Sequence, residues 1–323
     1  MAQIQKKTTV AEATTQTAAG IAATTINVEQ RKPLVPDVAT VPPIPTETTL
    51  ETTAAAMPVT YQIVEHDGDV RKLIDHANRN LGVVGYTEHG LRHVTLVARI
   101  ARNVVRILGY DEHIQELTAI AGILHDIGNV VNRRGHPNSG AVMSMPILQR
   151  LGMPMEDIAV VMGAIGSHGD DGGGLAEPVH AVCAALIVAD KSDVHRSRVR
   201  NLDPSTFDAH DRVNYAVVSS FLRVDADEKT ITLELTIDTA ISSVMDYFEI
   251  FLPRMLQSKR AAEFLGCRFH IEINGNTILS SAGSYAVRQR KRGGSRLSSL
   301  PPRPRGRLES LLPPGFTAEV RTP

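Results

Sequence analysis

The stretch Leu124-His125-Asp126-Ile127-Gly128 decides the fold of this chain, because a histidine and an aspartate close a helix that is otherwise apolar. Apolar residues recur at helical spacing from Ile114 to Leu124, and this pattern predicts a helix that ends at Gly128. Asp126 therefore lies at the end of a buried helix. An unpaired carboxylate in the interior costs several kcal/mol, so Asp126 needs a partner.

Two more polar residues fall on the apolar faces of neighbouring predicted helices. His93 stands four residues before Val97, on the buried side of a helix predicted over 91–107. Asp190 directly follows the apolar run 186–189. A single buried histidine is most often a hydrogen-bonded core residue, but two His and two Asp from three helices satisfy one another best around a cation. Imidazole and carboxylate ligands together suit Mn²⁺, Fe²⁺, Zn²⁺, Ni²⁺ or Co²⁺.

The hydrophobic period changes along the folded part of the chain. Further helices are predicted over 139–151, with a kink at Pro146, over 154–165 and over 178–194. After residue 203 the pattern predicts a β-hairpin of 221–225 with 231–238, a helix over about 241–265, and a hairpin of 268–273 with 277–280 around Asn274-Gly275. The predicted fold class is mainly α: a helical bundle with a small C-terminal α+β unit and disordered termini.

Composition separates the two ends of the 323-residue chain from this folded part. Residues 1–60 hold fourteen Thr, six Pro and no aromatic residue, so they bury too little apolar surface to offset chain entropy. Residues 281–323 carry nine Arg or Lys against two Glu. We therefore predict disordered segments over 1–60 and 281–323, a helical metal-binding domain over 61–203, and the α+β unit over 204–280.

Charge and cysteine usage exclude several classes of protein. The formal net charge of the chain is −1. The basic tail, residues 281–323, carries +7, so the rest of the chain carries −8. Nucleic-acid binding is therefore not expected, except through the tail. Two cysteines are too few for a disulfide framework, and neither a signal peptide nor an apolar run of about 18 residues occurs. We expect a cytoplasmic protein with no membrane partner.

His93, then His125-Asp126, then Asp190 resemble the H…HD…D signature of the HD-domain metal-dependent phosphohydrolases. The neighbouring residues are similar too: 93–101 resemble the first-histidine helix, 124–129 resemble "LHDIGK" with Asn129 in the last place, and 189–193 resemble the closing "AD" segment. The resemblance covers about residues 87–200, and the following segment is similar to a bacterial HD subgroup of unassigned substrate. It implies an HD helical bundle in which these four residues bind a divalent metal.

Two further histidines resemble second-metal ligands of the HD-GYP branch. His136 begins a segment similar to "HPxxGA". His168 lies in the segment that occupies the position of the branch's "HHExxDGxGYP" motif. One of the paired histidines, the Glu and the Tyr-Pro are missing here, which argues against cyclic-di-GMP as the substrate. We expect His136 and His168 to bind a second ion, with an exposed loop position as the alternative. His89, one turn before His93, is expected near the ligands or exposed rather than on a metal.

The resemblance implies a hydrolase that activates water on one or two divalent ions, Mg²⁺ included. We expect His125 and Asp126 at the catalytic centre, and Lys191, with Arg133 and Arg134, as charge partners of phosphate; for these basic residues ordinary surface charge is the alternative. The predicted function is hydrolysis of a nucleotide or another small phosphoester, as a phosphomonoesterase or phosphodiesterase, by a possible homodimer. The alternative is an HD-fold signalling or scaffold module that binds a nucleotide or a partner protein without turnover.

Overall fold

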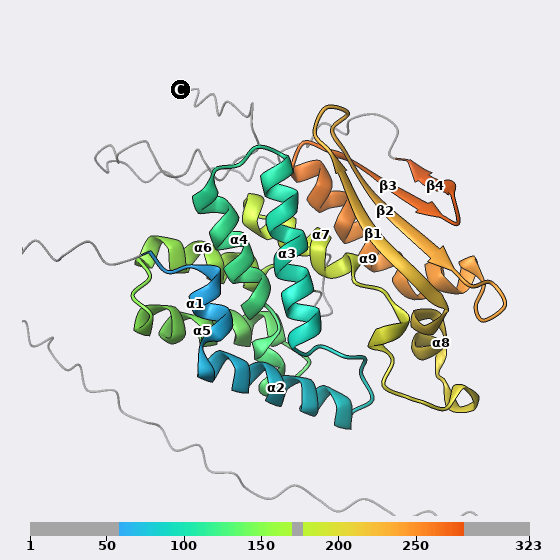
Figure 1. Ribbon diagram of the computed structural model, residues 1–323, viewed down its shortest axis with the longest axis horizontal. Helices are drawn as coiled ribbons and strands as arrows, with labels where there is room; N and C mark the ends of the chain where they lie inside the picture. Colours follow the sequence, from blue (N-terminus) through green and yellow to red (C-terminus); the bar gives the residue numbers. More distant parts are fainter. Residues whose placement is uncertain (1–57, 170–176, 281–323) are drawn as a thin grey trace, which may run out of the picture. The chain divides into compact units, whose positions relative to one another are not determined.

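The computed structural model describes residues 58–169 and 177–280 (Figure 1). The segments predicted to be disordered lie outside these residues, apart from 58–60, where the Thr60 side chain accepts a hydrogen bond from Ile63 and caps the first helix. The described helices are α1 (Tyr61–His66), α2 (Gly68–Val83), α3 (Leu91–Ile107), α4 (Glu112–Leu124), α5 (His136–Arg150), α6 (Met155–Gly166), α7 (Ala181–Ser192), α8 (Ala209–Ala216) and α9 (Val244–Phe264). Short 3₁₀ turns lie at Ile127–Val130 (η2), Arg196–Arg198 (η3) and Pro204–Thr206 (η4).

Two helices form the centre of the bundle. All twelve residues of α7 are buried, in agreement with its nearly continuous apolar sequence, and α4 is buried from Leu117 to Leu124. α3 packs against both of them. Gly122 permits this close approach, because a Cβ there would lie 2.5 Å from the Cα of Ala98 in α3. The contact brings the end of α4 next to the first turn of α3.

The structure corrects several predicted helix boundaries and adds elements. The helix expected to reach Gly128 ends at Leu124, and the chain then turns through His125 and Asp126 into η2. α5 begins at His136 rather than Ser139 and continues through Pro146. Helices α1, α2 and α8 were not predicted, although the buried residues of α2 (Val70, Ile74, Ala77 and Leu81) recur at helical spacing.

The α+β unit contains one four-stranded sheet in the order β1-β2-β3-β4, formed by Val217–Asp225, Thr230–Ile237, Arg268–Ile273 and Asn276–Ser280 (Figure 1). The two outer pairs are the antiparallel hairpins that the sequence predicted. The pairing of β2 with β3 is parallel, so it requires a crossover, which α9 supplies. The alternating apolar residues of β2 and β3 are buried, and α9 contacts both this sheet and α7.

The mainly α architecture with a small α+β unit is therefore confirmed for the described residues. α9 joins the two parts, since its Arg254 donates a hydrogen bond to the backbone oxygen of Asp190 in α7, at 3.0 Å. Within the described ranges, none of the helices combines the length and the hydropathy needed to cross a bilayer.

Candidate metal centre

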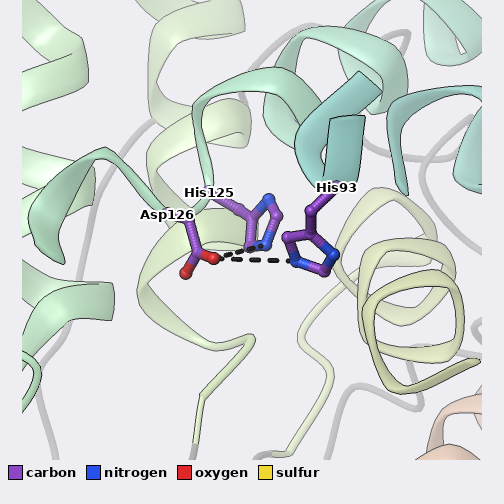
Figure 2. Close-up of side chains that lie close together, drawn as sticks. All are labelled: His93, His125 and Asp126. Atoms are coloured by element: carbon purple, nitrogen blue, oxygen red, sulfur yellow. Dashed lines mark ion pairs between the residues drawn. The ribbon is translucent and has the colours of Figure 1, made fainter. Parts of the chain in front are cut away.

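The side chains of His93, His125 and Asp126 converge in the interior (Figure 2). The Oδ2 atom of Asp126 lies 3.6 Å from Nε2 of His93 and 3.5 Å from Nε2 of His125. All three of these atoms are buried and have no hydrogen-bond partner. Buried polar atoms are nearly always paired, so three unpaired ones at a common point indicate that a charged ligand binds there.

The hydrogen bonds of the histidines orient them toward this point. Nδ1 of His125 bonds the backbone oxygen of Gly122 at 2.8 Å, and Nδ1 of His93 bonds the Asp193 carboxylate at 2.6 Å. A carbonyl or carboxylate oxygen only accepts, so each Nδ1 carries the hydrogen. Each Nε2 therefore presents its lone pair to the cluster, as a metal-binding imidazole does.

Asp190 lies beside the same two histidines. Its Oδ1 lies 3.4 Å from Nε2 of His93 and 3.8 Å from Nε2 of His125. Its Oδ2 accepts a hydrogen bond from the buried ammonium of Lys191 at 2.6 Å. Burial favours the neutral amine and lowers the pKa of Lys191, against the attraction of Asp190. Lys191 thus neutralises a ligand and also lines the cavity described below.

His136 and His168 lie on the other side of Asp126. Nε2 of His136 is 3.4 Å from Oδ1 of Asp126, and one ligand atom each from Asp126, His136 and His168 fit within 4.8 Å of one another. Asn129 donates a hydrogen bond to the same Oδ1 at 2.8 Å. Oδ2 of Asp126 thus faces His93 and His125, and Oδ1 faces His136, a geometry that suits two neighbouring ions. His168 lies near both groups, since one ligand atom each from His125, His168 and Asp190 also fit within 4.8 Å of one another.

A glycine in the deciding stretch makes this second group possible. A Cβ on Gly128 would overlap the backbone carbonyl oxygen of His136 and lie 2.5 Å from the amide nitrogen of Gly140. Only a residue without a side chain lets η2 lie against the first turn of α5. This contact carries His136 to Asp126.

Burial favours the neutral form of His125, His136 and His168. It lowers the pKa of His136 to about 4 and lowers the pKa of His168 well below its usual value. The pKa of His125 is lowered in the same way, and the pKa of Asp126 lies well below its usual range in spite of its burial. Neutral imidazoles and ionised carboxylates are the protonation states that bind metal.

His93 differs from the other histidines because of Asp193, a residue that the sequence analysis did not single out. Burial alone would lower the pKa of His93, but the neighbouring carboxylates of Asp190 and Asp193 raise it. Asp193 is itself held by Arg92, at 2.9 Å, and by the fully buried Arg198, at 3.6 Å. Its spacing of three residues from Asp190 was the available signal.

A cavity of about 490 Å³ opens onto the cluster. Asp126, His136, His168 and Asp190 line it, together with the predicted phosphate partners Arg133, Arg134 and Lys191. His89, expected near the ligands or exposed, is buried and lines the cavity, with its ring 5.3 Å from that of His93. Thus four of the six predicted ligands and the three predicted cationic residues line one cavity, and the other two ligands, His93 and His125, lie beside Asp126.

This donor set fits divalent transition metals. It combines imidazole nitrogens with carboxylate oxygens, has no thiolate, and leaves an open side toward the cavity. Both cysteines of the chain are free and buried, and neither belongs to a candidate metal-binding group among the described residues. Several divalent ions suit such ligands.

Residues 90–195 match the family described as HD domain. This part of the chain is similar to HD domains, and residues 90–195 are called the HD domain below. All six predicted ligands fall within it, as does Asp193. Proteins of the HD family are generally metal-dependent hydrolases, and the match covers about a third of this chain.

One relative resembles more than the HD domain alone. The uncharacterized protein MJ1020 of Methanocaldococcus jannaschii is 27% identical over 177 residues, which cover 48% of this chain and 66% of that protein. The alignment thus spans slightly less than two thirds of the relative. No solved structure matches the chain significantly.

The cavity also contains residues from outside the HD domain. Arg254 and Gln257 of α9 line it, and the sequence analysis assigned them no role. Their position was not predictable from the chain pattern, because α9 reaches the HD domain only through the tertiary contact with α7.

Proposed function

We propose that this chain is a metal-dependent phosphohydrolase that cleaves a nucleotide or another small phosphoester. The observation that carries the proposal is the convergence of three buried, unpaired ligand atoms from His93, His125 and Asp126 beneath a cavity lined by cationic side chains. A bound divalent ion would supply Lewis acidity and an acidic water molecule at this point. Two free cysteines agree with the expected cytoplasmic location.

The protein residues have distinct roles in this proposal. The imidazoles of His93 and His125 would hold the first ion, together with Asp126 and Asp190. His136 and His168, with Asp126, would hold a second ion. Lys191, Arg133 and Arg134 bind the anionic oxygens of the substrate, since each of them lines the cavity and carries hydrogen-bond donors.

Metal content and hydrolysis test the proposal together. Purified protein should retain a transition metal by elemental analysis and should hydrolyse members of a phosphomonoester and phosphodiester panel. Asp126→Asn and His125→Ala should lose both properties. His113→Ala is the matched control, because His113 pairs with Asp157 on a different part of the bundle, at 2.9 Å.

Three outcomes separate the alternatives. Loss of metal and activity in Asp126→Asn, with both retained in His113→Ala, supports the hydrolase. Undiminished activity in Asp126→Asn and His125→Ala contradicts it. Tight nucleotide binding without any product, in several divalent metals, would instead support the non-catalytic signalling or scaffold module.

A further inference from the structure

Two arginines from different parts of the chain lie where two cavities meet. Arg133, in the loop between η2 and α5, and Arg254, in α9, line both the cavity of the metal centre and a second cavity of about 400 Å³. Tyr86 and His89 also line both. Residues that line two cavities lie between them, so these side chains form the boundary.

Each of the two guanidinium groups rests on an aromatic ring. Arg133 lies 5.5 Å from the ring centroid of Tyr86, and Arg254 lies 5.3 Å from that of Phe251. Stacking fixes the plane of a guanidinium without occupying its N–H donors. The pair thus presents oriented, cationic donors at the boundary between the cavities.

α9 also contributes polar atoms that have no partner within the described residues. The Nε atom of Arg254 is buried and unpaired, as is the Oε1 atom of Gln257, whose residue is 1% exposed. The two residues are one helical turn apart and both line the metal cavity. A buried donor and a buried acceptor left unpaired on a cavity wall indicate a ligand that pairs with them.

The second cavity has a different chemistry from the first. Asp208, His210 and Asp211, at the start of α8, line it together with Ile250 and Phe251. Carboxylates accept hydrogen bonds from hydroxyl or amine groups and repel a further phosphate. The cavity therefore fits the uncharged, hydrogen-bonding part of a substrate.

We propose that the α+β unit determines substrate specificity: Arg254, with Arg133, binds the phosphate group, Oε1 of Gln257 accepts a hydrogen bond from a hydroxyl or amine group of the substrate, and the second cavity receives the alcohol portion. The substrate is then a phosphomonoester whose alcohol portion carries hydroxyl or amine groups and no second anionic group. This inference rests on the proposed hydrolase, but it concerns residues that bind no metal, and Arg254 and Gln257 lie outside the HD domain.

The test uses the full-length chain loaded with Mn²⁺ and the variants Arg254→Met, Arg254→Lys and Arg260→Met. Arg260 is the matched control, because it is exposed on the same helix. Calorimetry with inorganic phosphate, kcat and KM for a hydrolysed phosphomonoester, and metal content are measured for each. Arg254→Met should weaken phosphate binding about tenfold to a hundredfold, from the loss of charged hydrogen bonds, and raise KM more than it lowers kcat. Arg254→Lys should fall between, since lysine keeps the charge and loses the forked donors.

Two results would overturn this role of Arg254. One is phosphate affinity in Arg254→Met equal to that of Arg260→Met. The other is a loss of metal in Arg254→Met that matches the loss of activity. Arg254 would then act only by its hydrogen bond to the backbone oxygen of Asp190, which supports that residue. If wild-type protein hydrolyses no phosphoester but phosphate binding still depends on Arg254, the binding site stands and the proposed hydrolase fails.

A second comparison tests the alcohol portion. Ribose 5-phosphate should bind more tightly than inorganic phosphate, and ribose 1,5-bisphosphate should bind less tightly than the monophosphate. Asp208→Asn should reduce the difference in affinity between the monophosphate and the bisphosphate. The asparagine side chain can still accept the hydrogen bond from the amide of Asp211 and so cap α8. Tighter binding of the bisphosphate to wild-type protein contradicts the assignment of the second cavity.

Discussion

Replacing Asp193 by asparagine should weaken both metal binding and folding, for separable reasons. The Asp193 carboxylate accepts a hydrogen bond from Nδ1 of His93 at 2.6 Å, and its charge faces Arg92 and the buried Arg198. An asparagine side chain at this position would keep nearly the same shape and lose the negative charge. The variant therefore tests the electrostatic role of this side chain with little change in packing.

The expected magnitudes follow from burial. Asp193 and Arg198 are each only 2% exposed at the side chain, and removing one partner of a buried ion pair costs about 3–5 kcal/mol. For a folded part of this size that lowers Tm by roughly 6–20 °C in metal-free protein. Carboxylates that orient a metal-binding histidine contribute about tenfold to a hundredfold in metal affinity. Asp193→Asn should show both effects.

Thermal unfolding in chelator and competitive metal titration measure the two effects independently. Asp157→Asn is the control: Asp157 is also a buried carboxylate that pairs with a histidine, His113, but it lies away from the metal centre. It should destabilise the fold and leave metal affinity unchanged. Metal affinity in Asp193→Asn within about twofold of wild type would refute the orienting role of Asp193.

Three more predictions concern the second ion, the close helix contact and a helix cap. His136→Asn and His168→Asn should each reduce metal content from two ions per chain to one by elemental analysis, whereas an unchanged stoichiometry excludes the second site. Gly128→Ala should lower the free energy of unfolding by about 1–3 kcal/mol in urea denaturation, since its Cβ overlaps backbone, whereas Gly68→Ala, with no atom within 4 Å, should be tolerated. Nδ1 of His180 accepts a hydrogen bond from the backbone amide of Cys183, and burial lowers the pKa of His180. Below about pH 6.5 the unfolded chain therefore binds more protons than the folded chain, and the free energy of unfolding decreases as the pH is lowered. In metal-free protein, His180→Ser should therefore lose less stability than wild type between about pH 7 and about pH 5 in urea denaturation; equal losses contradict this role.

The sequence predicted the ligands because they break a local rule. His93, His125, Asp126 and Asp190 are polar residues on faces whose spacing is otherwise apolar, so each is conspicuous within its own helix. The structure brings them together, and it adds His136 and His168, which were predicted only through the resemblance to known proteins.

The residues that were missed are defined by partners far away in the chain. Asp193 and Arg198 are identified by what they contact, namely His93 and the backbone of Glu88, about a hundred positions earlier. The parallel pairing of β2 with β3 was missed for the same reason. Local sequence signals each hairpin, but it does not show how the two hairpins pair with each other. Long-range packing, not local propensity, decides these features.

The wrong end predicted for α4 explains how the deciding stretch works. α4 ends at Leu124, but His125 keeps α-helical dihedral angles, with φ −57° and ψ −34°. Asp126 departs from them, with φ −100° and ψ 0°, and the chain enters η2. Nε2 of His125 and Oδ2 of Asp126 lie 3.5 Å apart beside His93. Within η2, Gly128 lies against the backbone of His136, whose imidazole reaches the other oxygen of Asp126. The end of α4 therefore matters for the position of His136 rather than for that of His125.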